Sequence, residues 1–143
     1  MSKTFHLKVI TPNKIVLDEP VEQIVARSVD GEVGILPDHI PLITPLTASP
    51  FKYWKNGEIN VACVLGGMLE VSKEGVTIIS DHAALADDID VVIAEKEKEL
   101  AEAKLAQKKD KVDVQKAEME LSKLLAMLEA VELARKLKRA RGG

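Results

Sequence analysis

The stretch Asp87-Asp88-Ile89-Asp90-Val91-Val92-Ile93-Ala94 divides this 143-residue chain into two parts of different construction. Upstream of it lie all six prolines, which fall between Pro12 and Pro50, and most of the glycines. From Val76 to Arg141 the chain contains neither residue type. Because glycine and proline punctuate turns and interrupt helices, the pattern predicts short strands and loops over residues 1–86 and mostly continuous helix over residues 87–143.

The first part alternates apolar and polar residues over short runs, as in Phe5–Val9, which predicts half-buried strands. Asn56-Gly57 predicts a tight hairpin, because both residues tolerate positive φ. Glu74-Gly75 predicts a second hairpin, between Met68–Val71 and Val76–Ser80. Regularly spaced turn signals without a helical period predict a small antiparallel sandwich or barrel.

The second part predicts two helices joined by a turn at Gln107–Lys111. Asp88 or Asp90 is expected to cap the first helix, and Asp113 the second. The apolar stripe of the first helix is thin, so the hairpin should pack marginally and be able to open. The second helix has apolar residues at the three- and four-residue spacing of a helical hairpin or coiled coil: Val114, Ala117, Leu121, Leu124, Leu128 and Val131.

Composition and charge narrow the functional classes. The net charge of −3 argues against a nucleic-acid binder, which usually shows a basic face. Cys63 alternates with its neighbours in an apolar run, which predicts a buried, reduced thiol. No run approaches the length of a membrane span and the N-terminus lacks a signal-peptide core, so a soluble, cytoplasmic protein is expected.

No pattern of catalytic or metal-binding residues is found in the sequence. The three histidines, His6, His39 and His82, lack the short spacings of a zinc site. No glycine pair is followed by the lysine and helix start of a phosphate loop, and the acidic cluster before Val91 lacks the spacing of a calcium loop. We therefore expect no enzyme activity, no metal and no cofactor.

The run Gly31-Glu32-Val33-Gly34-Ile35-Leu36-Pro37-Asp38-His39-Ile40-Pro41-Leu42 carries a family resemblance. The chain closely resembles the epsilon subunits of bacterial F-type ATP synthases, whose β domain contains a G-E-x-G-I-x-P-x-H-x-P-L run. Four further segments agree in order: Phe5–Pro12, Gly66–Val71, Val76–Ser80 and Asp88–Asp90. The resemblance spans essentially the whole chain.

The resemblance implies an α+β fold, a ten-stranded antiparallel β-sandwich over residues 1–86 followed by a two-helix hairpin over residues 87–143. It implies a non-catalytic subunit of the central stalk, coupling rotation of a proton- or sodium-driven c-ring to ATP synthesis. By position, Glu32 would face the c-ring and His39 the gamma subunit; the alternatives are an ordinary turn acid and a polar residue that orients the loop. Asp38 departs from the glycine common in the family, which suggests a local backbone difference.

In that family the hairpin either lies folded against the sandwich or extends along gamma between the alpha and beta subunits and inhibits ATP hydrolysis. The cationic end of the second helix would then meet an acidic patch of the catalytic head; the alternative is a basic end that complements the helix dipole. The residues concerned are Arg135, Lys136, Lys138, Arg139 and Arg141. The resemblance also implies a peripheral location on the cytoplasmic face of the cell membrane, without insertion.

Some relatives bind ATP in the folded hairpin through an I-D-x-x-R-A motif. Here Ile89, Asp90 and Ala94 match, but Ile93 replaces the arginine. Lys123 and Met127 occupy the arginine positions of the second helix. Since aliphatic side chains cannot supply the forked donors that hold phosphate, weak or absent ATP binding is predicted. An ATP-sensing hairpin is thus the alternative function, and a free-standing adaptor would not explain the Gly31–Leu42 run.

Overall fold

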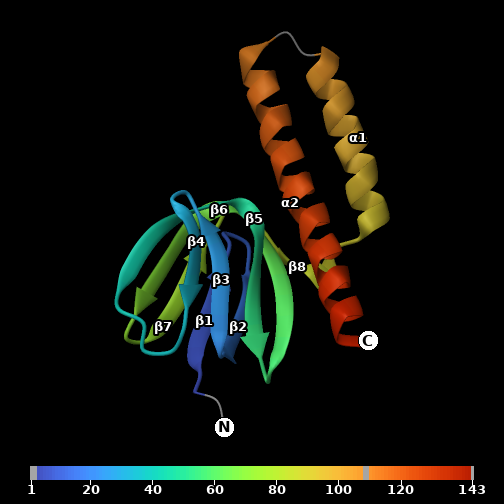
Figure 1. Cartoon of the computed structure of the whole chain (residues 1–143). Helices are drawn as coiled ribbons and strands as arrows, with labels where there is room; N and C mark the ends of the chain where they lie inside the picture. The colour runs from blue at the N-terminus through green and yellow to red at the C-terminus, as the bar shows by residue number, and fades with distance from the viewer. Residues whose placement is uncertain (1–2, 108–109, 143) are drawn as a thin grey trace.

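The protein is described here from a computed structural model, which covers residues 3–107 and 110–142. A β-sandwich is followed by an arm of two antiparallel helices that projects beyond it (Figure 1). The strands are β1 (Phe5–Ile10), β2 (Ile15–Val21), β3 (Gln23–Ser28), β4 (Gly31–Ile35), β5 (Leu42–Lys55), β6 (Glu58–Ser72), β7 (Gly75–Ile79) and β8 (Ala83–Leu85).

The strands follow the order β2-β1-β7-β6-β5-β3-β4, and β8 pairs with β6. Among the described residues every pairing is antiparallel except β1 with β7, which is parallel. The predicted sandwich followed by two helices is confirmed. The strand count differs, since the described part of the chain holds eight strands instead of ten.

Two long strands account for the smaller count. β5 has 14 residues and β6 has 15, and they pair along their whole length, from Leu42 opposite Val71 to Lys55 opposite Glu58. Within β6, Gly66 (φ +70) and Gly67 (φ +107) adopt backbone conformations that side chains disfavour. A Cβ atom on Gly67 would lie 2.0 Å from the carbonyl oxygen of Ile79. The two glycines therefore let β6 continue through a backbone conformation that other residues disfavour.

Both predicted hairpins are confirmed. Lys55 pairs with Glu58 across Asn56 (φ 52) and Gly57 (φ 78), which is a two-residue turn with positive φ at both positions. Ser72 pairs with Gly75 at the second hairpin. The interior between the layers is filled mainly by aliphatic side chains, of which the most deeply buried are Leu7, Val9, Val21, Ile24, Ile35, Leu69 and Ile78, with Phe51 the largest.

After the short 3-10 helix η1 (Ala86–Asp88) come the two helices of the arm, α1 (Val91–Gln107) and α2 (Lys111–Gly142). The Asp90 carboxylate accepts a hydrogen bond from the Ile93 amide at 3.2 Å, as predicted for a cap of the first helix. The predicted cap at Asp113 is wrong. Asp110 accepts from the Val112 amide at 3.0 Å instead, because α2 begins at Lys111 and already includes Asp113 in its first turn.

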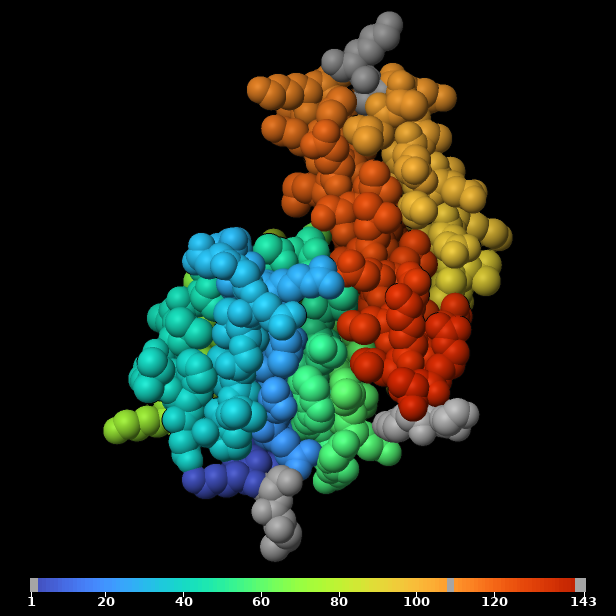
Figure 2. Space-filling model, in the orientation of Figure 1, coloured from blue at the N-terminus to red at the C-terminus, as the bar shows by residue number. Residues whose placement is uncertain are grey.

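The predicted turn is correspondingly shorter, since Gln107 belongs to α1 and Lys111 to α2. Its residues 108–109 lie outside the described residues. The helices pack through a small cluster centred on Ala94, Ala101 and Leu124. The C-terminal part of α2 lies against the sandwich, whereas α1 and the first turns of α2 extend away from it (Figures 1 and 2).

Candidate functional site

The contact between the sandwich and the arm, called the seam below, is built on the outer face of β6. Along β6, Ala62 and Val64 point into the sandwich, while Val61 and Cys63 point to α2. This division follows from the two-residue period of a strand. Ala130 of α2 covers them and is 0% exposed, and Ala86 of η1 completes the buried cluster.

Small side chains dominate the centre of the seam. Alanine at positions 86 and 130 lets the helix approach the strand closely, but it buries little apolar area. The larger apolar side chains that pack against this cluster are only partly buried: Ile89, Met127, Leu133 and Leu137. The arm is therefore held by a contact of modest size, which fits an element that moves.

Ion pairs lie at the edges of the seam. Arg27 of β3 contacts Glu129 of α2, with 3.1 Å between Nη1 and Oε2. Lys138 near the end of α2 lies 3.6 Å from Asp87. All four side chains are about half exposed or more, so each pair should contribute only ~0.2–1 kcal/mol.

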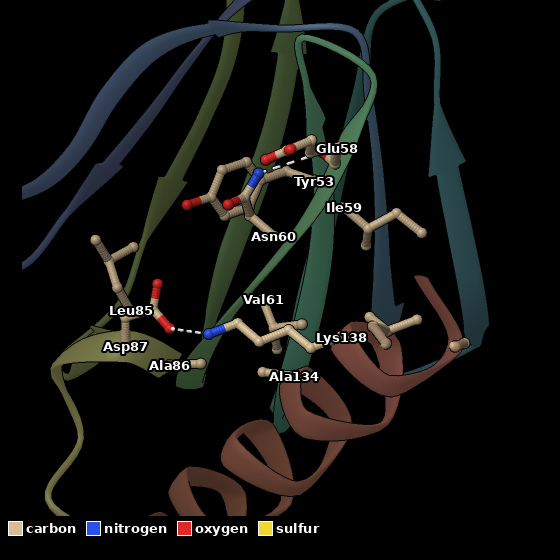
Figure 3. A pocket seen from close by; sticks show the side chains of 12 residues that line it. Tyr53, Glu58, Ile59, Asn60, Val61, Leu85, Ala86, Asp87, Ala134 and Lys138 are labelled. Atoms are coloured by element: carbon tan, nitrogen blue, oxygen red, sulfur yellow. Dashed lines mark hydrogen bonds and ion pairs between the residues drawn. The ribbon is translucent and has the colours of Figure 1, made fainter. Parts of the chain in front are cut away.

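A cavity of about 410 Å³ opens at the Lys138 edge of the seam (Figure 3). Its floor is apolar, and its polar groups include the Tyr53 hydroxyl and Asn60, whose amide donates to the Glu58 carbonyl at 3.2 Å. Burial, assisted by the carboxylates of Glu19, Asp87 and Asp88, raises the pKa of Tyr53 to about 12. That phenol therefore stays neutral at physiological pH.

Cys63 confirms the predicted buried free thiol. It is 1% exposed, and burial raises its pKa to about 11 although a hydrogen bond involving Ala84 acts in the opposite direction. A buried neutral thiol reacts slowly, because the thiolate is the nucleophile. Since Cys63 lies under Ala130, its reactivity should report whether the arm covers the sandwich.

The positions that correspond to the ATP-binding motif of some relatives lie at the base of the arm. Asp90 caps α1, Ala94 is 2% exposed between the helices, and Ile93 points outward and is 54% exposed. Met127 packs in the seam, and Lys123 pairs with Glu120 at 3.4 Å. No guanidinium stands at any of these positions. This arrangement favours helix packing over phosphate binding.

The basic end of α2 lies beside the sandwich (Figure 2). Arg135, Lys136, Lys138 and Arg139 are exposed there, whereas the Arg141 side chain lies outside the described residues. Lys136 lies 3.8 Å from Glu132 in the same helix, and Lys138 contacts Asp87 across the seam. The end of the helix therefore keeps most of its cationic surface available.

Glu32 and His39 lie at opposite ends of β4 and are not brought together. Glu32 is exposed and stands opposite Arg27 in the pairing of β3 with β4. His39 is exposed in the loop after β4, where its Nδ1 lies 2.7 Å from the Ile40 carbonyl oxygen. Next to it, Asp38 has φ 64, the left-handed conformation that glycine adopts readily, and its carboxylate pairs with Lys3.

Three apolar side chains surround this loop in the open. Leu36 is 56% exposed, Ile40 is 74% exposed and Ile43 at the start of β5 is 66% exposed. Sequence reasoning singled out His39 but not these three, nor Ala130 and Arg27 at the seam. Whether an apolar residue is exposed depends on the tertiary fold. In the sequence, only the unbroken apolar run Ile40-Pro41-Leu42-Ile43 indicated an apolar surface at this loop.

Within residues 3–107 and 110–142, no group of histidine, cysteine or acidic side chains is arranged to hold a metal ion. The helices described there are also too polar or too short to span a bilayer.

Two family models match the chain in succession. The beta-sandwich domain of the ATP synthase delta/epsilon chain matches residues 4–86, and the long alpha-helix domain of the same chain matches residues 87–132. The chain belongs to the ATP synthase delta/epsilon family. The resemblance noted from the Gly31–Leu42 run is thereby confirmed.

Bacterial members of the delta/epsilon family cover nearly the whole chain. The ATP synthase epsilon chain of Nitratidesulfovibrio vulgaris is 41% identical over 128 residues, 90% of this chain and 96% of its own. That of Caldanaerobacter subterraneus subsp. tengcongensis is 43% identical over 129 residues, 90% of this chain and 94% of its own. Both are named ATP synthase epsilon chain.

Solved structures agree with this family. A chain in the Euglena gracilis mitochondrial ATP synthase superposes with a TM-score of 0.73 at 25% identity, covering 90% of this chain and 81% of that one. A chain in the central stalk and c-ring of the Tetrahymena thermophila enzyme superposes with a TM-score of 0.61 at 14% identity, over 91% of this chain and 98% of that one. The second match supports the fold alone.

Proposed function

We propose that this protein is a non-catalytic rotor subunit of the central stalk of a bacterial F-type ATP synthase, with a sandwich that couples and an arm that inhibits. In this proposal residues 1–86 join the gamma subunit to the c-ring, and residues 87–143 regulate ATP hydrolysis. The observation that carries the proposal is the seam, where a helix is held on a stable sandwich by small residues and exposed ion pairs.

The proposed coupling role rests on two exposed regions of the sandwich, one at each end of β4. Leu36, Ile40 and Ile43 present apolar surface that a partner would cover, and His39 lies among them as the proposed contact with gamma. Glu32, at the other end of β4, is the proposed contact with the c-ring. Protons or sodium ions would drive rotation of the c-ring, and this chain would work at the cytoplasmic face of the membrane without entering it.

The inhibitory role rests on how lightly the arm is packed. Within α1 only Ala94 and Ala101 are buried, while Val92, Ile93 and Leu100 are more than half exposed. Such a helix gains little from its present neighbours and would gain more from a larger apolar partner. Extension along gamma into the ring of alpha and beta subunits would supply that partner.

The cationic end of α2 would then reach the catalytic head. After Glu132 the sequence contains no further acidic residue, but it contains five basic ones: Arg135, Lys136, Lys138, Arg139 and Arg141. Their attraction to an acidic surface would be screened by salt, with a range of roughly 8–10 Å at physiological ionic strength. An ATP-sensing role is disfavoured, because Ile93 and Met127 provide no donors where phosphate would lie.

The proposal is tested by ATP hydrolysis of a matching α3β3γ head, with the full chain and with a version that ends at Ala86. The shorter version should fold, because the sandwich core is made of residues that precede Ala86. We expect both versions to bind and only the full chain to slow hydrolysis. If both versions bind and neither slows hydrolysis, the arm is not inhibitory and the chain serves only to couple the gamma subunit to the c-ring. Failure of both versions to bind would overturn the proposed rotor role.

A further inference from the structure

His82 occupies an unusual position between the sandwich and the arm. It lies between β7 and β8, and its backbone carbonyl accepts hydrogen bonds from the Leu65 amide at 2.9 Å and from the Ser80 hydroxyl at 2.9 Å. Its Nε2 atom is buried and has no hydrogen-bond partner among the described residues. A buried ring nitrogen without a hydrogen-bond partner destabilises the conformation that buries it.

The direction of the His82 ring follows from the strand that it begins. The Leu65 bond continues the β6–β8 ladder by one residue beyond Ala83 opposite Val64. Ala83 belongs to the sandwich core and Ala84 packs in the seam. Because strand side chains alternate between faces, His82 shares the face of Ala84 and is directed to α2.

The facing part of α2 lies one turn before the seam. Met127 packs against the cluster that includes Ala84, and Lys123 precedes it by four residues on the same helix face. Lys123 is only 25% exposed and pairs with Glu120 at 3.4 Å. The arm therefore places the Lys123 ammonium group beside the imidazole, and the nearby Glu120 carboxylate is already paired with Lys123.

The charges around His82 act mainly against its protonation. Burial lowers the pKa of the imidazole below its ordinary value of 6.5; Lys123 adds to this effect and Lys14, in the turn before β2, adds less. Glu120 opposes it, and the adjacent Asp81 is exposed. Lys123 belongs to α2, so its contribution falls when α2 leaves, together with whatever part of the burial α2 provides.

We propose that His82 is a proton-operated release for the arm, so that acidification shifts the protein from the folded arm to the open arm. This inference rests on the proposed regulatory role of the arm. In the folded state the Nε2–H group of a charged imidazole would be buried without an acceptor, whereas in the open state water would solvate it. Protonation therefore costs more when the arm is folded.

The direction of the pH effect follows from linkage. The pKa of His82 is lower with the arm folded than with it open, so the open state binds the proton more tightly. Above the pKa of the open state both forms are neutral and His82 has no effect on the balance. As pH falls through that value, the folded arm loses stability, and the loss is complete below the lower pKa of the folded state. Hydrolysis should thus be inhibited more strongly in acid.

The native Cys63 provides the measurement, because α2 covers it and it is the only cysteine. We would follow the rate at which a maleimide labels the full chain from about pH 7.5 to about pH 5.5, and do the same with His82→Gln. Dividing the two rates at each pH removes the pH dependence of the thiol itself. We expect the wild-type to variant ratio to rise about threefold or more as pH falls.

Three further variants sharpen the result. His39→Gln removes a histidine far from the arm and should leave the pH response intact. His82→Asn replaces the ring by a second neutral side chain, so the result does not depend on how glutamine packs. Lys123→Gln should weaken the response, whereas Lys116→Gln, an exposed site on the same helix, should not. A ratio that stays flat with pH for both His82 variants would overturn the proposal.

The same variants in the α3β3γ hydrolysis assay separate this inference from the proposed function. If labelling of Cys63 responds to acid through His82 but inhibition of hydrolysis does not, protonation of His82 opens the arm and the arm does not inhibit hydrolysis. If acid strengthens inhibition equally in the wild type and His82→Gln, the arm inhibits hydrolysis but His82 does not control its opening.

Discussion

Arg27 of β3 and Glu129 of α2, separated by 102 residues in the sequence, form an ion pair at 3.1 Å that bridges the sandwich and the arm. Both side chains are about half exposed, so water and salt screen their attraction. The seam beneath them is made of small apolar residues around Ala130. The folded arm is consequently held by several weak contributions, each of which can be tested separately.

Glu129→Gln should loosen the arm slightly. Loss of an exposed pair costs ~0.2–1 kcal/mol, which corresponds to a rise of at most about fivefold in the labelling rate of Cys63. The difference from the wild type should vanish at high salt, because salt already screens the pair. Glu118→Gln removes the same charge from an exposed site of α2 and should change nothing. A salt-independent effect would point to packing as the origin.

Ala130→Leu should displace the arm. Ala130 is 0% exposed against Val61 and Cys63, and the added carbons have no space without a shift of α2. Overpacking of this kind costs ~1–3 kcal/mol, so Cys63 should be labelled roughly five- to 150-fold faster. Stronger inhibition of hydrolysis should accompany it.

Ala103→Leu serves as the control for this change, since Ala103 is exposed on α1. It should leave both the labelling rate and the inhibition unchanged. If Ala130→Leu protects Cys63 as well as the wild type does, the folded arm is not held at this cluster.

Gly67→Ala should destabilise the sandwich by about 2 kcal/mol or more. The glycine has φ +107, and the new Cβ would lie 2.0 Å from the Ile79 carbonyl oxygen, which is backbone and cannot move aside cheaply. Gly34→Ala is the matched control, because nothing lies within 4 Å of a Cβ at that position. The measurement is urea unfolding of both variants. Equal midpoints would show that β6 does not need glycine at this position.

ATP should bind weakly or not at all. Calorimetric titration to millimolar ATP, corrected for the heat of dilution, should reveal no site with a sub-millimolar dissociation constant. The physical reason is the absence of forked donors at Ile93 and Met127, of which Met127 is packed in the seam. A clear sub-millimolar site would contradict this expectation and favour the ATP-sensing alternative.

The basic end of α2 should matter for inhibition and not for assembly. Replacing Arg135 and Arg139 together by glutamine should weaken inhibition of hydrolysis severalfold at low salt, with a smaller difference at high salt. The control replaces Lys96 and Lys98 of α1 by glutamine, which removes the same amount of charge from another part of the arm. Equal loss of inhibition in both pairs would indicate a general charge effect instead of a contact by the tip.

Features governed by local conformation were predictable from the sequence. Asn56-Gly57 makes the predicted turn because both residues accept positive φ, and Asp90 caps α1 because its carboxylate reaches an amide three residues on. The cap of α2 was misplaced because Asp110 and Asp113 are equally good cap residues in isolation. The choice depends on where the chain turns back, which local preference does not specify.

The division of this protein into sandwich and arm could be predicted from its glycines and prolines, because these residues act on the backbone over a few positions at a time. Three features depend on the tertiary structure: which face of β6 receives the arm, the contact of Arg27 with Glu129, and the burial of the His82 Nε2 atom without a partner among the described residues. These contacts join segments far apart in the chain. They depend on the register of strands and the packing of α2, and no short stretch of sequence carries that information.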